Sequence, residues 1–218
     1  MNYRRGRRRK RLWFIPVILV VLALAAYQFA GPLFGHAHIG DCAVTRNSEV
    51  NYMSVTDTQK IIADAIGSSK KISRASISCT YEPWTKTESQ SLEESGLTLR
   101  AEGMRARVKN VFGKIPYGGY EPGGVSTGHI PGSAHYEGRA IDYFFRPIDN
   151  PQKKEAGWRL AHWAVAHAGE LMINTVIYDD KIWTRQSSWL GWRDYEHPSG
   201  ATDNPILRHL DHVHIDVD

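Results

Sequence analysis

The most informative stretch of the sequence is SAHYEGRAID, at residues 133–142. Its polar first half is typical of a turn, and the aromatic and branched residues of RAIDYFFR, residues 139–146, predict a strand. His135 is therefore expected in a turn just before a strand, and Asp142 within that strand. A small residue at Gly138 lets the turn fold back, so that both side chains can reach one metal ion.

A second stretch, DHVHID at residues 211–216, stands close to the end of the chain, where residues 212–217 read as a strand. His212 and His214 are two positions apart, so both side chains face the same side of that strand. Imidazole and carboxylate groups are ligands that suit Zn²⁺, and a catalytic zinc keeps three protein ligands and one open position. A sheet that places the two strands side by side would bring the two stretches together.

The two stretches together resemble a known superfamily, that of D-Ala-D-Ala metallopeptidases, lysostaphin-type endopeptidases and hedgehog signalling domains. Its SxHxxGxAxD motif is matched at every defined position, and a distant HxH follows; the matching residues are Ser133, His135, Gly138, Ala140 and Asp142. The resemblance covers about residues 100–218 and is greatest to an actinobacterial branch of secreted D-Ala-D-Ala-carboxypeptidase-like domains. It implies a small antiparallel sheet with packed helices, and zinc ligation by His135, Asp142 and His214.

The resemblance leaves two residues open as the general base. In the D-Ala-D-Ala branch an acid three residues before the last ligand activates water, and Asp211 has that position. In the HxH branches the histidine two residues before the ligand lies beside the metal, as His212 would. Strand periodicity favours His212, whereas the established chemistry of carboxylate bases favours Asp211. We expect Asp211 to be the base and His212 to polarise the oxyanion or orient the water.

The substrate-binding residues are less well defined by the pattern. Members of the superfamily often carry an arginine-bearing strand before the SxH motif, but here that place is taken by a glycine- and proline-rich loop, residues 116–132. The loop can shape a substrate cleft or be a plain connector. His129 within it can line that cleft, but we expect it to have a surface role. Ser133 and Arg139 are our candidate substrate-binding residues.

The remaining sequence predicts a mixed order of helices and strands, which favours an α+β fold over a doubly wound sheet. Helices are expected over residues 99–112 and 153–172, and strands over residues 139–146, 175–183 and 212–217.

The N-terminal residues predict a membrane-spanning segment. Residues 12–30, LWFIPVILVVLALAAYQFA, carry no charge and are long enough to span about 30 Å of hydrocarbon as a helix. Seven basic residues and no acid precede them within residues 1–11, which favours a cytoplasmic N-terminus and an extracytoplasmic C-terminal part. A cleaved signal peptide is the alternative. We favour an uncleaved single-pass anchor because a signal peptide has a shorter apolar core, of about 7–15 residues, and because the candidate cleavage site Ala23-Leu24-Ala25 lies inside the apolar run.

The charge of the chain beyond its N-terminal tail excludes a basic, nucleic-acid-binding domain. The formal net charge is +4, but the seven basic residues of the N-terminal tail account for it, and the rest has 20 basic against 23 acidic residues. We therefore expect no nucleic-acid partner.

The number and positions of the cysteines agree with a C-terminal part that lies outside the membrane. The chain has two cysteines, Cys42 and Cys79, both after the apolar segment. Outside the cytoplasm such a pair is expected to form a disulfide, with two unpaired thiols as the alternative.

These observations give a domain plan of a cytoplasmic tail, a transmembrane helix, a linker with a small disulfide-tied segment and a metallopeptidase-like domain, at residues 1–11, 12–30, 31–98 and 99–218. The expected function is that of a membrane-anchored, zinc-dependent peptidase acting on peptidoglycan stem peptides outside the membrane. A non-catalytic module that binds cell-wall peptides or a protein partner, with a structural or degenerate metal site, is the alternative. The oligomeric state is not indicated by the sequence.

Overall fold

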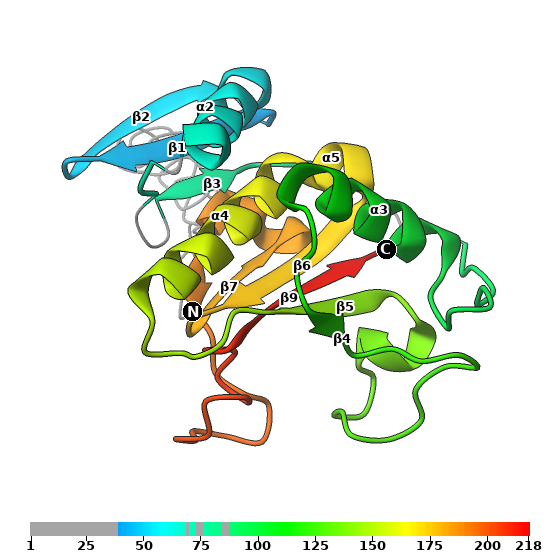
Figure 1. Cartoon of the computed structure of the whole chain (residues 1–218). Helices are drawn as coiled ribbons and strands as arrows, with labels where there is room; N and C mark the ends of the chain where they lie inside the picture. The colour runs from blue at the N-terminus through cyan, green and yellow to red at the C-terminus, as the bar shows by residue number, and fades with distance from the viewer. Residues whose placement is uncertain (1–38, 69, 73–75, 84–87) are drawn as a thin grey trace, which may run out of the picture. The chain divides into compact units, whose positions relative to one another are not determined.

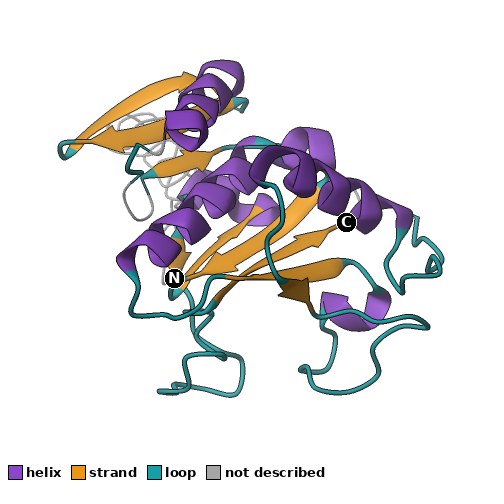
Figure 2. Cartoon of the chain, in the orientation of Figure 1, coloured by secondary structure: helices purple, strands orange, loops and turns teal. Residues whose placement is uncertain are grey.

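The computed structural model describes residues 39–68, 70–72, 76–83 and 88–218, all within one compact unit, Ala37–Asp218. The fold is α+β, with two antiparallel sheets and several helices (Figures 1 and 2). The elements are β1 (Asp41–Arg46), β2 (Glu49–Ser54), α2 (Val55–Ser68), β3 (Ile77–Cys79), α3 (Leu99–Phe112), β4 (Tyr117–Gly118), η1 (Ala134–Glu137), β5 (Ala140–Phe144), α4 (Pro151–Ala166), α5 (Ala168–Leu171), β6 (Ile173–Tyr178), β7 (Lys181–Thr184), η2 (Arg185–Leu190), β8 (Arg193–Asp194) and β9 (His212–Val217).

The larger sheet has six strands in the order β4-β5-β9-β6-β7-β8, and every neighbouring pair is antiparallel. Helices α3, α4 and α5 cover one of its faces (Figure 1). Strand β9, at the centre, has the sequence HVHIDV and is buried along its whole length. Since successive side chains point to opposite faces, its aliphatic residues join the core under the helices, whereas two histidines and an aspartate gather on the other face.

The smaller sheet has the strand order β2-β1-β3 and is tied by the predicted disulfide. Cys42 of β1 lies directly opposite Cys79 of β3, and the two are bonded, so this prediction is confirmed. Their Cα atoms are 3.9 Å apart, closer than the usual range of about 4.4–6.8 Å. Both residues are fully buried, so the bond lies in the core and not at the surface.

Two of the predicted elements have the expected bounds, and two others are divided in the structure. The helix over residues 99–112 and the strand over residues 212–217 have the predicted bounds. The strand predicted over residues 175–183 is instead a hairpin of β6 and β7, because Asp179 and Asp180 both adopt left-handed backbone conformations and turn the chain. The predicted helix over residues 153–172 is divided into α4 and α5 at His167.

The predicted membrane anchor at residues 12–30 lies outside the described residues, as does the tail before it. Of the helices that the structure describes, none is both long and apolar enough to cross a membrane.

Candidate metal centre

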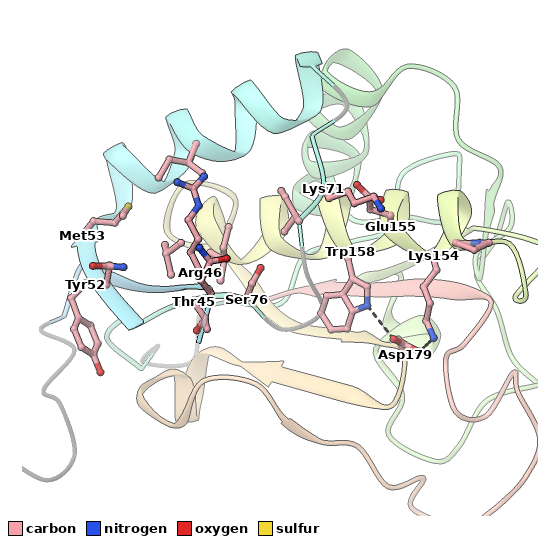
Figure 3. Close-up of a pocket in the computed structure, with 17 residues that line it drawn as sticks. Thr45, Arg46, Tyr52, Met53, Lys71, Ser76, Lys154, Glu155, Trp158 and Asp179 are labelled. Atoms are coloured by element: carbon pink, nitrogen blue, oxygen red, sulfur yellow. Dashed lines mark hydrogen bonds and ion pairs between the residues drawn. The ribbon is translucent and has the colours of Figure 1, made fainter. Parts of the chain in front are cut away.

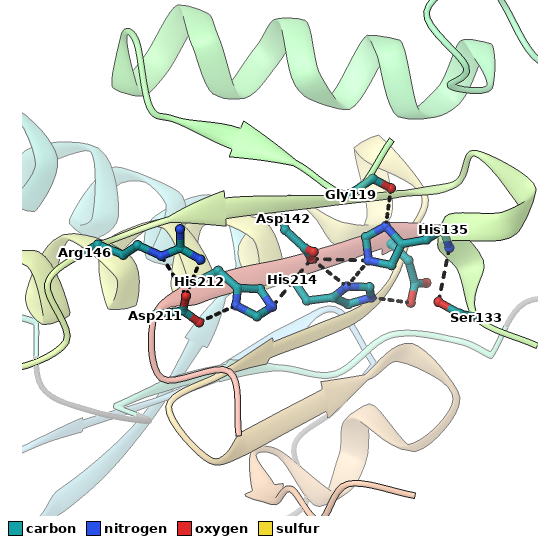
Figure 4. Close-up of polar contacts among 9 residues, drawn as sticks. Gly119, Ser133, His135, Asp142, Arg146, Asp211, His212 and His214 are labelled. Atoms are coloured by element: carbon teal, nitrogen blue, oxygen red, sulfur yellow. Dashed lines mark hydrogen bonds and ion pairs between the residues drawn. The ribbon is translucent and has the colours of Figure 1, made fainter. Parts of the chain in front are cut away.

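Three side chains from distant parts of the chain meet on the polar face of the six-stranded sheet (Figure 4). Asp142 on β5 lies directly opposite His214 on β9, and Oδ1 of Asp142 is 3.1 Å from Nδ1 of His214. Nε2 of His135 lies 3.1 Å from that Nδ1 and 3.3 Å from that Oδ1. All three residues are buried, and the group can hold a metal ion. The predicted convergence of these three residues is confirmed.

The short helix η1 places His135 next to the sheet. Ser133 caps it, with its hydroxyl accepting a hydrogen bond from the backbone N–H of His135 at 3.4 Å. Gly138 ends it in a left-handed conformation (φ +64°), and a Cβ there would lie 2.5 Å from the carbonyl oxygen of Gly96. A glycine is therefore required at the turn that leads from His135 into β5.

Each histidine of the group is oriented by a second contact on its other ring nitrogen. Nδ1 of His135 donates to the backbone carbonyl of Gly119 at 2.7 Å. Nε2 of His214 faces Oδ2 of Asp216 at 3.4 Å. Such outer partners select which ring nitrogen is left for a metal ion, here Nε2 of His135 and Nδ1 of His214.

Asp211 and His212 form a separate pair beside the group. Nδ1 of His212 donates to Oδ1 of Asp211 at 2.7 Å, and Nε2 of His212 points towards Asp142, 3.7 Å from Oδ1 (Figure 4). Oδ2 of Asp211 accepts from the guanidinium of Arg146 at 2.6 and 2.8 Å. Both oxygens of Asp211 are thus engaged by neighbouring side chains, and it is His212 that faces the group.

The charges of the site stabilise one another. Burial acts to raise the pKa of Asp142, but hydrogen bonds from His135 and His214 outweigh it and hold the pKa well below its usual range. Burial acts to lower the pKa of His214, but Asp142 and Asp216 outweigh it and raise that pKa to about 9. For Asp211, hydrogen bonds from His212 and Arg146 outweigh burial, and the pKa is lowered. The carboxylates are therefore ionised at neutral pH.

A cleft of about 470 Å³ opens over the group, within the usual size range of small-molecule sites. Histidine is the most frequent of the described residues that line it, and these histidines are His129, His135, His197, His209, His212 and His214. His129 lines the cleft, which was the alternative to the surface role expected for it, and its ring stacks on that of His135 with the centroids 4.0 Å apart. The loop of residues 116–132 therefore contributes to the cleft, through Gly128, His129, Ile130 and Gly132.

The two candidate substrate-binding residues, Ser133 and Arg139, also line this cleft. The guanidinium of Arg139 donates to Glu137 and to the backbone carbonyl of Val217, each at 2.6 Å. Ser133 serves as the cap of η1. Both side chains thus have structural contacts within the chain. A substrate that binds either side chain would have to do so alongside these contacts.

Asp216, Gly119 and Arg146 also belong to the site, although none of them was expected there from the sequence. Asp216 had a detectable signal, because it is the next residue on the same face of the strand as His212 and His214. Gly119 and Arg146 had no such signal. Gly119 contributes only its backbone carbonyl, Arg146 lies beyond the end of β5, and neither belongs to a recognisable motif.

A larger cavity, of about 1050 Å³, lies away from this group, between β1, β2 and the start of α4 (Figure 3). Its buried carboxylate, Asp179, is held by Nζ of Lys154 at 2.7 Å and by Nε1 of Trp158 at 3.1 Å. These contacts fix α4 against the turn between β6 and β7, which is a structural role.

A family model described as "VldE, C-terminal domain" matches residues 93–206, more than half of the chain. The match includes His135 and Asp142 and ends before β9, which carries His214. No curated protein and no solved structure matches the chain.

Proposed function

The chain belongs to the family described as VldE, C-terminal domain, and for this member we propose a zinc-dependent peptidase activity on peptidoglycan stem peptides. The observation that carries the proposal is the group of His135, Asp142 and His214, with a fourth polar residue, His212, directed at it. Three ligands beneath an open cleft are typical of catalytic zinc sites, whereas structural zinc sites are closed by four protein ligands.

The spacing of the ligand atoms fits zinc. Ligands about 2.0–2.1 Å from a tetrahedral ion lie about 3.3 Å from one another. The three separations here are 3.1, 3.1 and 3.3 Å. Two imidazoles and one carboxylate also suit zinc better than calcium or magnesium, which prefer oxygen ligands. A bound zinc ion supplies Lewis-acid polarisation of a carbonyl group and lowers the pKa of water.

We assign the proton transfer to His212, with Asp211 as the residue that orients it. Nδ1–H of His212 donates to Asp211, which leaves the Nε2 lone pair facing the group and able to accept a proton. Asp211 itself is an ionised carboxylate whose oxygens already accept from His212 and Arg146. This assignment reverses the division of roles expected from the sequence, and it rests on the direction of the two side chains.

We further propose that the domain works outside the cytoplasm, anchored by residues 12–30 with the N-terminus inside. The basic tail and the apolar segment support this orientation. The disulfide between Cys42 and Cys79 supports it independently, because such bonds persist in oxidising compartments.

The test is digestion of purified muropeptides by the full chain in nanodiscs, read by mass spectrometry. We expect hydrolysis that a chelator abolishes and added zinc restores. Release of a terminal D-Ala would indicate a carboxypeptidase, and opening of a crosslink an endopeptidase. His214→Ala should lose both zinc and activity, whereas His167→Gln, between α4 and α5 and outside the cleft, should retain both. If the zinc-loaded chain binds the peptides and cleaves none, it is instead a non-catalytic binding module.

A further inference from the structure

A further cavity, of about 440 Å³, lies on the opposite face of β5 from the candidate metal centre. Tyr143 lines it and follows Asp142 directly, and consecutive residues of a strand point to opposite faces. The cavity lies beside α3 and β4, and no residue within the described ranges lines both this cavity and the cleft over the metal group. It is therefore a separate site.

The walls of this cavity are largely apolar. Val108 and Ile115 line it together with the rings of Tyr117 and Tyr143, which pack edge to face with their centroids 6.4 Å apart. Tyr143 is 2% exposed and its hydroxyl donates to Sδ of Met104 at 3.5 Å, so its ring is fixed as a wall. The volume falls in the range of about 300–1,000 Å³ that is usual for small-molecule sites.

The charged residues of the cavity are all cations. Arg105, Lys109 and Lys114 line it, and none of the carboxylates that the structure describes does. The charge of Arg105 is neutralised by Glu102, since Nη2 of Arg105 lies 2.6 Å from Oε2 of Glu102. Lys109 and Lys114 are exposed, and neither forms an ion pair with any carboxylate in the described part of the chain. Two positive charges are thus left unneutralised beside an apolar pocket.

We propose that this cavity binds an anionic amphiphile, a molecule with an apolar body and a carboxylate or phosphate head. The apolar walls would bury the body, and Lys109 and Lys114 would hold the head. A cation or a sugar is disfavoured, since the first meets like charge and the second finds few hydrogen-bonding groups on the walls. The head group can come from a free alkyl carboxylate or from an anionic lipid, and both present the same chemistry to the site.

The experiment uses the full chain in nanodiscs of zwitterionic lipid and a twelve-carbon alkyl carboxylate with a photoreactive group on its chain. After illumination, labelled residues are mapped by mass spectrometry. We expect labelling on residues 105–117 and at Tyr143, and several-fold less with the uncharged alcohol of the same length. Competition by anionic lipid in the nanodisc, set against competition by free dodecanoate, identifies the source of the head group.

Two variants separate the charge from the apolar body. Lys109→Gln with Lys114→Gln should weaken labelling roughly two- to thirtyfold, as expected for two exposed ion pairs. Ala106→Phe, at the edge of the same cavity, should reduce labelling by filling it while keeping all three cations. The matched control is Lys71→Gln with Lys153→Gln, two exposed lysines outside the cavity, which should change nothing. Equal labelling by the alcohol, or labelling unchanged in both cavity variants, would overturn the proposal.

Discussion

The backbone carbonyl of Gly119 accepts a hydrogen bond from Nδ1 of His135 at 2.7 Å, across 16 residues of sequence. This contact leaves Nε2 of His135 as the nitrogen that faces Asp142 and His214. The loop of residues 116–132 thus sets the tautomer of a candidate metal ligand.

Gly119→Ala should disrupt the metal centre. A Cβ there would lie 2.4 Å from Cε1 of His135 and 3.0 Å from Oδ2 of Asp142, so the imidazole has to move. We expect zinc affinity to fall roughly 10- to 100-fold, measured by competition with a chromogenic chelator. The matched control is Gly123→Ala, where φ is +84° and no atom lies within 4 Å of the added Cβ. Equal losses in both variants would trace the effect to backbone strain.

Asp211 and His212 should behave as one unit in catalysis. His212→Ala is expected to reduce kcat by about 10²–10⁴-fold with zinc retained, and Asp211→Asn to reduce it within the same range. Because Asp211 acts through His212, the double variant should be no slower than His212→Ala alone. The measurement is kcat and zinc content for all four proteins. Near-normal turnover by His212→Ala, with Asp211→Asn inactive, would instead make Asp211 the base.

Zinc binding should release a proton at neutral pH. Since the pKa of His214 is raised to about 9 in the metal-free protein, this residue carries a proton at pH 7 that the ion must displace. We expect about one proton released per ion at pH 7, and zinc affinity rising roughly tenfold per pH unit until about pH 9. Calorimetry in buffers of different ionisation enthalpy measures the proton count. A count of zero at pH 7 would show that His214 is already neutral.

The same pKa predicts how the metal-free fold responds to pH. A histidine whose folded-state pKa is raised stabilises the fold fully below its unfolded pKa of about 6.5, and this contribution is lost as pH rises through about 9. Chemical denaturation of the metal-free protein should therefore show falling stability between about pH 6.5 and 9. A profile that is flat over this range, or that rises, would contradict the prediction.

Asp216→Asn should weaken zinc binding without removing a ligand. Oδ2 of Asp216 lies 3.4 Å from Nε2 of His214 and orients the imidazole. Loss of such an outer carboxylate typically reduces metal affinity about 10- to 100-fold. Asp203→Asn, an exposed aspartate before β9, serves as the control. If Asp216→Asn binds zinc as tightly as the control, then the carboxylate does not orient His214.

Replacing the disulfide with Cys42→Ser and Cys79→Ser should lower the free energy of unfolding by about 3–4 kcal/mol, as the loss of a crosslink over 37 residues predicts. The bond ties the smaller sheet, and the metal residues belong to the larger sheet and η1, so zinc content should be unchanged. Urea denaturation with a parallel zinc assay gives both quantities. Loss of zinc from the folded double-serine variant would show that the two sheets are coupled.

The sequence by itself determined the local parts of this protein. The alternation in HVHIDV places its polar residues on one face of β9, because successive side chains of a strand point in opposite directions. The motif around His135 and Asp142 identifies two candidate ligands from the sequence alone, without the distance between them. By contrast, β1 and β2 gave no usable signal, because β2 is exposed along most of its length and has no apolar face to set a period.

Only the tertiary structure decided how these parts form a site. The register of β5 and β9 sets Asp142 opposite His214, and the loop of residues 116–132 brings Gly119 and His129 against His135. The direction of Asp211 was also settled by packing, since Arg146 and His212 hold its two oxygens. These are contacts between segments far apart in the chain. Periodicity and motif spacing describe only neighbours along the backbone, whereas register, loop placement and side-chain partners depend on how the whole core packs.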